Sequence, residues 1–240
     1  MKAFIVLLLV SLADFSLQAE WSYDDESKWP GICTTGKQQS PINIRTKEAV
    51  LDEDHVFMRG PLQFRGFGNV PVTAANNGHT LQWTALTNSP APVLSGGPLR
   101  SNYTFVQLHF HWLSEHAIDG VKYPMELHFL LIKNGLTMEE ALLRPDGLAV
   151  VAVLAMLSRG VDSDHGLDEI MPLVPYLMDS TQHQTMPHTI NATRLLSPEV
   201  QSYYTYHGSL TTPNCNEVVT WIVMDKPIPI TSDQVKTLLI

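Results

Sequence analysis

The sequence predicts a single α+β domain in which short helices lie around a central β-sheet. Short runs rich in β-branched and aromatic residues, bounded by Gly, Pro or Asn, favour strands. Helical patterns are few, and neither an internal repeat nor a Gly/Ser linker divides the 240 residues, which favours one domain. The predicted strands are residues 80–83, 103–112, 126–133, 148–157 and 218–224.

Helices are expected at three places, and the sheet remains the larger element. Residues 137–141 form a short candidate helix, and residues 166–178 form a longer one. A third helix is expected to start, with a cap, at residues 232–235. These segments are predicted to decorate the sheet.

The composition is that of a folded protein with an acidic surface. Hydrophobic residues make up 44% and charged residues 16% of the chain, which excludes a disordered chain. The 15 basic and 24 acidic residues give a formal charge of 15 − 24 = −9, and basic runs are absent. This balance argues against nucleic acid as a partner, and it names no protein partner.

The first 19 residues predict a secretory signal peptide. Lys2 precedes the largely apolar residues 3–12, and a polar stretch ends near Ala19. The alternative is a buried N-terminal helix, which fits poorly with the acidic residues that follow. A spanning helix requires roughly 20 apolar residues, so no spanning segment is expected. The mature domain is predicted to be residues 20–240.

If the protein is exported, two further features are expected at specific residues. Cys33 and Cys215 are the only cysteines, and an even count in an oxidising compartment favours a disulfide, the alternative being two separate buried thiols. Asn102 and Asn191 each begin an N-x-Thr sequon and are candidate glycosylation sites. The predicted location is therefore secreted or extracellular.

Two neighbouring predicted strands carry a histidine pattern typical of a metal site. Gln107, His109 and His111 are spaced two apart, so they lie on one face of a strand. Glu126 and His128 share a face of the next strand. Three imidazoles without a cysteine suit zinc and leave a fourth tetrahedral position open for catalysis. Gln107 and Glu126 are placed to accept hydrogen bonds from the ligands.

The alternative for this pattern is His-x-His on a strand without any metal. The nearby Glu-x-His makes the metal site the favoured interpretation. The remaining histidines lack such partners and are interpreted as surface groups or locally satisfied groups; these are His55, His116, His165, His183, His188 and His207.

Several motifs then resemble one known family, in the same order from about residue 21 to residue 235. They are QSPINI at 39–44, NNGHT at 76–80, QLHFHW at 107–112, SEH at 114–116, ELH at 126–128, RPDGLAV at 144–150, YHGSLTTP at 206–213 and VTW at 219–221. The chain resembles the α-class carbonic anhydrases, of the secreted type. The resemblance implies a large, mostly antiparallel, twisted sheet and the reversible hydration of carbon dioxide to bicarbonate and a proton.

The resemblance also implies how the metal site works. His109, His111 and His128 match the ligands of one zinc ion per chain, with Gln107 and Glu126 orienting them. Zinc-bound hydroxide is implied as the nucleophile that attacks carbon dioxide. The residues that match the orienting threonine, its carboxylate partner, the bicarbonate-binding threonine and the proton-shuttle histidine are Thr211, Glu115, Thr212 and His79, in that order.

Further matches concern the substrate pocket and the water network. Tyr23, Asn77 and Gln82 match the positions that order water near the shuttle, although many relatives have asparagine where Gln82 stands. The cysteine pair matches that of exported members and would brace the Thr211 loop. The apolar pocket for carbon dioxide is implied to consist of Leu130, Val150, Leu210, Val219 and Trp221, whose alternative is an ordinary core role.

The resemblance predicts one departure at the carboxyl end. The family pattern continues past residues 232–235 through another strand, whereas this chain stops at Ile240, so a shortened domain is expected. A longer form could carry a membrane attachment there. The rival functions are a non-catalytic binding module, an unstable shortened product, and a zinc hydrolase with Glu115 or Glu126 as its base.

Overall fold

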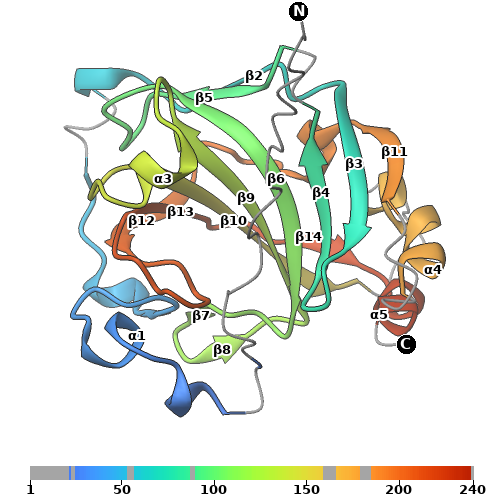
Figure 1. Ribbon diagram of the computed structural model, residues 1–240, viewed down its shortest axis with the longest axis horizontal. Coiled ribbons are helices and arrows are strands. Elements are labelled where there is room, and N and C mark those ends of the chain that lie inside the picture. Colours follow the sequence, from blue (N-terminus) through green and yellow to red (C-terminus); the bar gives the residue numbers. More distant parts are fainter. Residues whose placement is uncertain are drawn as a thin grey trace, which may run out of the picture.

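A large mixed β-sheet forms the centre of the computed structural model, and short helices lie around its periphery (Figure 1). The structure describes residues 22, 25–52, 57–86, 90–158, 166–178 and 185–238. Within them the predicted α+β fold, a single domain around a large and mostly antiparallel sheet, is confirmed. The predicted signal peptide at residues 1–19 lies outside the described residues.

The described residues form the following strands. They are β1 (Asn43–Ile44), β2 (Gln63–Arg65), β3 (Val70–Asn76), β4 (Leu81–Ala85), β5 (Val93–Ser95), β6 (Tyr103–Trp112), β7 (Ala117–Ile118), β8 (Val121–Lys122), β9 (Met125–Lys133), β10 (Leu148–Leu157), β11 (Thr185–Ile190), β12 (Tyr203–Gly208), β13 (Val219–Met224) and β14 (Ile228–Ile230).

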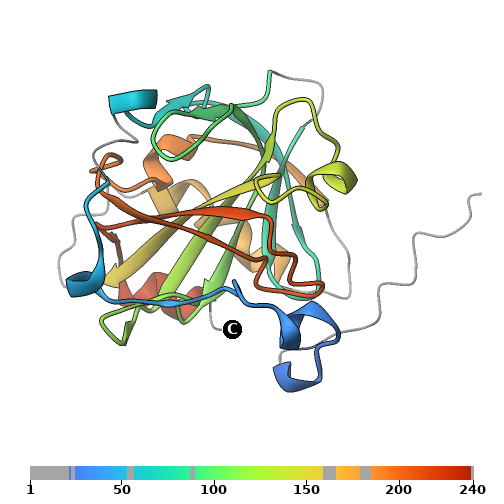
Figure 2. The ribbon, with the colours of Figure 1, turned by 90° about the vertical axis from the view of Figure 1, so that its left-hand side faces the viewer.

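The helices are short, and the longest of those named below has seven residues. The α-helices are α1 (Ile32–Thr35), α3 (Met138–Ala141), α4 (Val174–Leu177) and α5 (Ser232–Leu238). The 3-10 helices are η1 (Glu26–Lys28), η2 (Thr46–Glu48), η3 (Gly166–Glu169), η4 (Met171–Leu173) and η6 (Ala192–Leu195). The view turned by 90° places α1 at the outer edge of the molecule (Figure 2).

The main sheet has eleven strands in the described part of the chain. Its central path runs β11-β3-β4-β6-β9-β10-β13-β12, with β5 beside β6, β2 beside β5 and β14 beside β10. Most neighbours are antiparallel, while β10 runs parallel to β13 and to β14. The short strands β1, β7 and β8 form a separate sheet.

Strand β10 is buried on both faces, as its continuous apolar sequence requires. Ala149, Val151 and Val153 contribute to the larger hydrophobic core on one face of the sheet. Val150 and Ala152 contribute to the smaller core on the other face. The sheet therefore separates two cores, and a side chain's position along a strand decides which core it faces.

A β-bulge in β6 sets the face on which its histidines lie. The register with β9 shifts between Phe105 and Gln107. Phe105 belongs to the larger core, and so do Leu108 and Phe110, so the inward-facing positions change from odd to even at the bulge. His109 is thereby placed on the face opposite the larger core.

One of the three helix predictions needs correction. The single helix expected over residues 166–178 is divided into η3, η4 and α4, because Pro172 and Pro175 interrupt helical hydrogen bonding and occupy first-turn positions instead. The capped helix expected to start at residues 232–235 is confirmed: it begins at Ser232, and Thr231 caps it by accepting a 3.1 Å hydrogen bond from the Gln234 backbone. The α3 prediction is confirmed, with Thr137 in a capping box.

Candidate metal centre

The three histidines come from two adjacent strands. His109 and His111 lie on β6, and His128 lies on β9. His109 stands directly opposite His128 in the antiparallel register, so their side chains share one face of the sheet. Strand pairing alone thus brings together residues that are far apart in the sequence.

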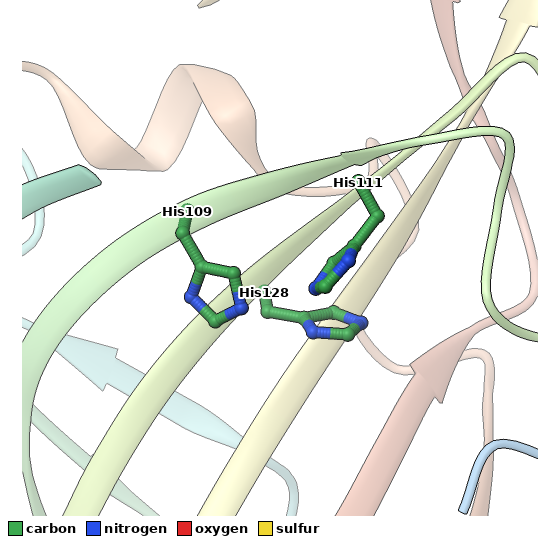
Figure 3. A group of neighbouring side chains, drawn as sticks. All are labelled: His109, His111 and His128. Carbon is green, nitrogen blue, oxygen red and sulfur yellow. The ribbon is translucent and has the colours of Figure 1, made fainter. Parts of the chain in front are cut away.

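The three imidazole rings face one another (Figure 3). Their centroids are 5.0 Å apart for His109 and His111, 5.2 Å for His109 and His128, and 4.6 Å for His111 and His128. One nitrogen from each ring lies within 4.8 Å of the others. This is the arrangement that a single small cation requires from three protein ligands.

Hydrogen-bond acceptors next to His109 and His128 determine which ring nitrogen of each is free to bind a metal. His109 Nδ1 donates to Gln107 Oε1 at 2.9 Å, which leaves Nε2 with its lone pair. His128 Nε2 donates to Glu126 Oε1 at 2.8 Å, which leaves Nδ1 with its lone pair. Among the described residues no hydrogen bond occupies either free nitrogen. Gln107 and Glu126 therefore lie where the sequence prediction put them.

His111 completes the set. Its Nδ1 lies 3.4 Å from Glu115 Oε1, and its Nε2 is a buried atom with no hydrogen-bond partner in the described part of the structure. A buried polar atom without a partner is costly, and binding a cation removes that cost. The residues present therefore fit a zinc ion.

Burial keeps the three histidines in their metal-binding form. Burial, together with the neighbouring His128, lowers the pKa of His109 to about 3. The pKa of His111 lies well below its ordinary value, and that of His128 is also lowered, in both cases chiefly through burial. Neutral imidazoles at neutral pH are the form that coordinates a metal.

Glu126 is an ionised carboxylate in a fully buried position. Burial raises its pKa, but the neighbouring His128 and the hydrogen bonds from His116 and His128 outweigh burial, so the pKa lies well below its ordinary value. The ionised form accepts hydrogen bonds only, which forces both histidines to present an N–H to it. Glu126 thus sets the tautomer of His128.

His116, interpreted from the sequence as a surface group or a locally satisfied group, is locally satisfied, and one of its partners is Glu126 of the metal centre. Its side chain is fully buried, and it donates from Nδ1 to Glu126 Oε1 at 2.6 Å and from its backbone N–H to Glu126 Oε2 at 2.8 Å. The contact depends on the turn that brings β9 back beside residues 114–116, a long-range feature that sequence spacing did not reveal.

The other ring nitrogen of His116 extends this hydrogen-bond network. His116 Nε2 forms a 2.6 Å hydrogen bond with Tyr206 Oη, and the Tyr206 hydroxyl donates to Ser40 Oγ at 2.9 Å. His116, Glu126 and His128 also lie close enough to hold a metal. Because Glu126 already accepts from both rings, this second group functions as a hydrogen-bond network.

Glu115 is a second buried carboxylate beside the histidines. Burial, together with the charge of Glu126, raises its pKa to about 8, and a hydrogen bond with Thr211 acts in the opposite direction. Its Oε2 lies 3.8 Å from His128 Nδ1. The structure thus brings Thr211 and Glu115 together at the edge of the histidine cluster.

The disulfide predicted from the cysteine count is confirmed. Cys33 and Cys215 are bonded, with their Cα atoms 5.0 Å apart. The Cys215 backbone N–H donates to the Thr212 carbonyl at 2.8 Å, so the bond is tied to the loop that carries both threonines. Gln39 Nε2 donates to the Cys215 carbonyl at 3.2 Å and joins the N-terminal segment to the same loop.

The predicted pocket residues gather in the smaller core, next to the histidines. Val150 is directly opposite Leu130 on β9 and opposite Trp221 on β13, so these three form a row across one face of the sheet. The Trp221 ring lies 5.0 Å from the His128 ring. Val219 is buried in the same core, and Leu210 packs against it.

The residues predicted for proton transfer lie at the start of β4. Gln82 is opposite His109, and Asn77 Nδ2 donates to Gln82 Oε1 at 3.2 Å. His79 is exposed, and its backbone N–H donates to Asn77 Oδ1 at 3.0 Å. Tyr23 lies outside the described residues.

The two sequons differ in their surroundings. Asn102 is exposed immediately before β6, and Thr104 of its sequon donates to Asn134 Oδ1 at 2.6 Å. Asn191 is partly buried at the start of η6 and accepts a hydrogen bond from Thr193 of its own sequon. None of the helices in the described ranges is long and apolar enough to cross a membrane.

Comparisons with known proteins agree with this centre. Residues 18–239 match the family model of the eukaryotic-type carbonic anhydrases. The chain is 35% identical over 229 residues to carbonic anhydrase 7 of Mus musculus, with 90% of this chain and 83% of that protein covered. It is 34% identical over 227 residues to carbonic anhydrase 7 of Homo sapiens, covering 89% and 83%.

A nematode relative is matched over almost the whole chain. The chain is 32% identical over 250 aligned positions to putative carbonic anhydrase 5 of Caenorhabditis elegans, with 98% of this chain and 77% of that protein covered. The chain therefore belongs to the eukaryotic-type carbonic anhydrase family and is an enzyme that acts on carbon dioxide and bicarbonate.

Proposed function

We propose that this chain hydrates carbon dioxide reversibly with one zinc ion held by His109, His111 and His128. Three neutral imidazoles with free nitrogens directed at one point support this proposal most directly. Zinc is a Lewis acid that brings the pKa of a water ligand toward neutrality and so supplies a hydroxide nucleophile, and carbonic anhydrases are the standard example of that chemistry.

Thr211 and Glu115 orient the nucleophile. The Thr211 hydroxyl has one proton, and donating it to the Glu115 carboxylate leaves the hydroxyl oxygen to accept from the nucleophile. A zinc ion held by the three neutral histidines would supply a positive charge that opposes the pKa-raising effect of burial on Glu115 and favours its ionised form. The fixed hydrogen bond aims a lone pair at the substrate instead of letting it rotate.

The apolar row beside His128 holds carbon dioxide. Leu130, Val150 and Trp221 form its base, with Leu210 and Val219 in the same core. An uncharged, apolar substrate gains by leaving water for such a surface, whereas charged bicarbonate is less well accommodated there. The Thr212 hydroxyl and backbone, in the loop next to Thr211, hold the bicarbonate product.

His79 moves the released proton to buffer. Histidine commonly relays protons in enzymes, and the exposed side chain of His79 is accessible to buffer. Gln82 is opposite His109, and His79 precedes Gln82 by three residues, which places its backbone on the order of 10 Å along the strand from the metal ligands. Asn77 and Gln82 order the water between the two, together with Tyr23.

The enzyme is exported after removal of residues 1–19. The Cys33–Cys215 disulfide supports this, because such bonds persist in oxidising compartments. Glycans on Asn102 and Asn191 would accompany export. Cleavage there would make residue 20 the first residue of the mature enzyme, which would work outside the cytosol.

Carbon dioxide hydration and zinc content, measured on the same purified mature chain, test this proposal. We expect one zinc per chain, rapid hydration, and loss of both zinc and activity in His109→Ala. Exposed His207, on β12, supplies the matched control His207→Ala, which should retain both. A folded chain with a sharp melting transition and bound zinc but no turnover would refute the proposal.

A further inference from the structure

A basic cleft lies beyond the opposite end of β6 from the histidines. Arg59, Arg65 and Arg100 line it, together with Gln63, Ser95 and Ser101, and its volume is about 350 Å³. Ser101 directly precedes the segment that enters β6, and His109 lies eight residues further on. At about 3.3 Å per residue, the cleft and the metal centre are therefore separated by more than 20 Å along the strand.

The three arginines of this arginine cleft have no acidic partner within the described residues. Two other arginines of the described residues lie beside carboxylates, in the pairs Arg45–Glu48 and Arg194–Glu169. Acidic residues outnumber basic ones by 24 to 15 in the whole chain. Three guanidinium groups without an acidic partner in the described residues thus give this cleft a positive charge, although the protein as a whole is acidic.

The strand pairing beside the cleft directs two of its polar side chains outward. Strand β2 pairs with β5, and Gln63 stands opposite Ser95. Phe64 turns the other way and packs on the core, with its ring 5.3 Å from that of Phe67. Gln63 and Arg65, one position to either side of Phe64, therefore lie on the exposed face.

A tight turn at Gly96 and Gly97 fixes the backbone positions of Arg59 and Arg100 relative to each other. Gly97 N–H donates to the Gly60 carbonyl at 2.8 Å, and a Cβ on Gly96 would lie 2.1 Å from the Pro61 oxygen. These contacts hold the backbone next to Arg59 against the turn that leads to Arg100. Arg59 Nη1 also donates to the Pro98 carbonyl at 3.3 Å.

We propose that the arginine cleft binds a tetrahedral oxyanion, a phosphate or sulfate group, separately from the catalytic centre. Guanidinium groups recognise such oxyanions through paired, charge-assisted hydrogen bonds, and the serine hydroxyls and the Gln63 amide add neutral donors. The cleft accepts a small group, since its volume is at the lower end for ligand sites.

Calorimetric titration of the zinc-loaded enzyme with inorganic phosphate and with inorganic sulfate tests the proposal, in chloride buffer of constant ionic strength. Asn102 also lines the cleft, so the titration uses two forms of the enzyme, one from the bacterial periplasm without a glycan and one from a eukaryotic secretory host with it. Binding by the glycan-free form alone would overturn the proposal for the exported enzyme. We expect saturable binding that weakens about tenfold in Arg65→Gln and again in Arg100→Gln, because each removes a charged donor.

The matched control is Arg144→Gln, which removes the same charge from an exposed position outside the cleft. It should bind like the parent, and carbon dioxide hydration should be unchanged in all three variants. Titration with O-phosphoserine shows whether the ligand of the cleft is a phosphate ester or the free anion. Binding at least as tight as that of phosphate identifies an ester group, and tenfold weaker binding identifies the free anion. Absence of saturable binding, or equal binding by parent and both cleft variants, would overturn the proposal.

Discussion

His116 donates to the same oxygen of Glu126 that accepts from His128, at 2.6 Å and 2.8 Å respectively. One buried carboxylate is thus held from two sides, and the side facing away from the metal centre is as tightly bonded as the side facing it. His116 therefore acts as a positioning residue for Glu126, and through Glu126 for His128.

Replacing Glu126 with Gln should weaken metal binding by about 10- to 100-fold. The amide keeps the shape of the side chain but offers one acceptor oxygen to three donors, so the tautomer of His128 is no longer enforced. Competition with a chelator measures the zinc affinity. Glu139→Gln, at an exposed position in α3, is the matched control. Equal affinity in both variants would contradict the orienting role of Glu126.

Replacing Thr211 with Ala should lower kcat/KM for carbon dioxide hydration about 100-fold, as the loss of a fixed orientation commonly does. Thr211→Ser keeps the hydroxyl that bonds to Glu115 and should retain most of the activity. Stopped-flow hydration with zinc-saturated protein separates this effect from metal loss. If the alanine and serine variants were equally active, the hydroxyl would have no orienting role.

Replacing His79 with Ala should slow turnover in weak buffer and leave it nearly normal in concentrated imidazole buffer. If the exposed imidazole relays protons as proposed, an external imidazole takes over that task in the variant. Hydration rates at two buffer concentrations make the comparison, with His207→Ala as the control. A His79→Ala rate equal to the parent's in weak buffer would rule out the shuttle.

Glu217 should give the enzyme a stability that disappears in acid. Its carboxylate accepts from the Gln39 side chain at 3.0 Å and from the Gln38 backbone at 2.6 Å, and these bonds lower its pKa. A lowered pKa in the folded state stabilises the fold above the unfolded value of about 4.3. That stabilisation is lost as the pH falls through the folded value.

Glu217→Gln should therefore lower the free energy of unfolding by a constant amount between pH 5 and 7, and the gap to the parent should close below about pH 4. Urea unfolding of parent and variant across this range measures the gap. A gap that stays constant down to pH 3.5 would show that the ionised carboxylate contributes nothing.

The histidine centre was predictable because its geometry follows from strand periodicity. Spacings of two residues on adjacent strands suffice to place His109, His111 and His128 together, and the same rule places Gln107 and Glu126. The five predicted strands are present with boundaries shifted by at most two residues, since their interiors are strongly apolar.

The network behind the centre was not predictable in the same way. His116 reaches Glu126 through a chain reversal, and Tyr206 and Ser40 come from distant parts of the sequence. The bulge after Phe105 also has no simple sequence signature. Its one sign in the sequence is that the buried apolar positions along β6 change from odd to even residue numbers. Tertiary pairing, rather than local propensity, decides such features.

The arginine cleft was missed for a different reason. Its three arginines are scattered over residues 59–100, and none belongs to a basic run. Only the pairing of β2 with β5 and the turn at Gly96 bring them together. A net charge of −9 describes the whole chain and hides such local reversals.

The Cys33–Cys215 bond turns most of the chain into a covalently closed ring, because the two cysteines are 182 positions apart. The three histidines of the candidate metal centre, Glu126 and Thr211 all lie inside that ring. A protease that cuts the ring once releases no fragment, and both new ends stay attached through the bond. A nicked molecule therefore retains every residue of the centre and a covalent bond that holds its parts together.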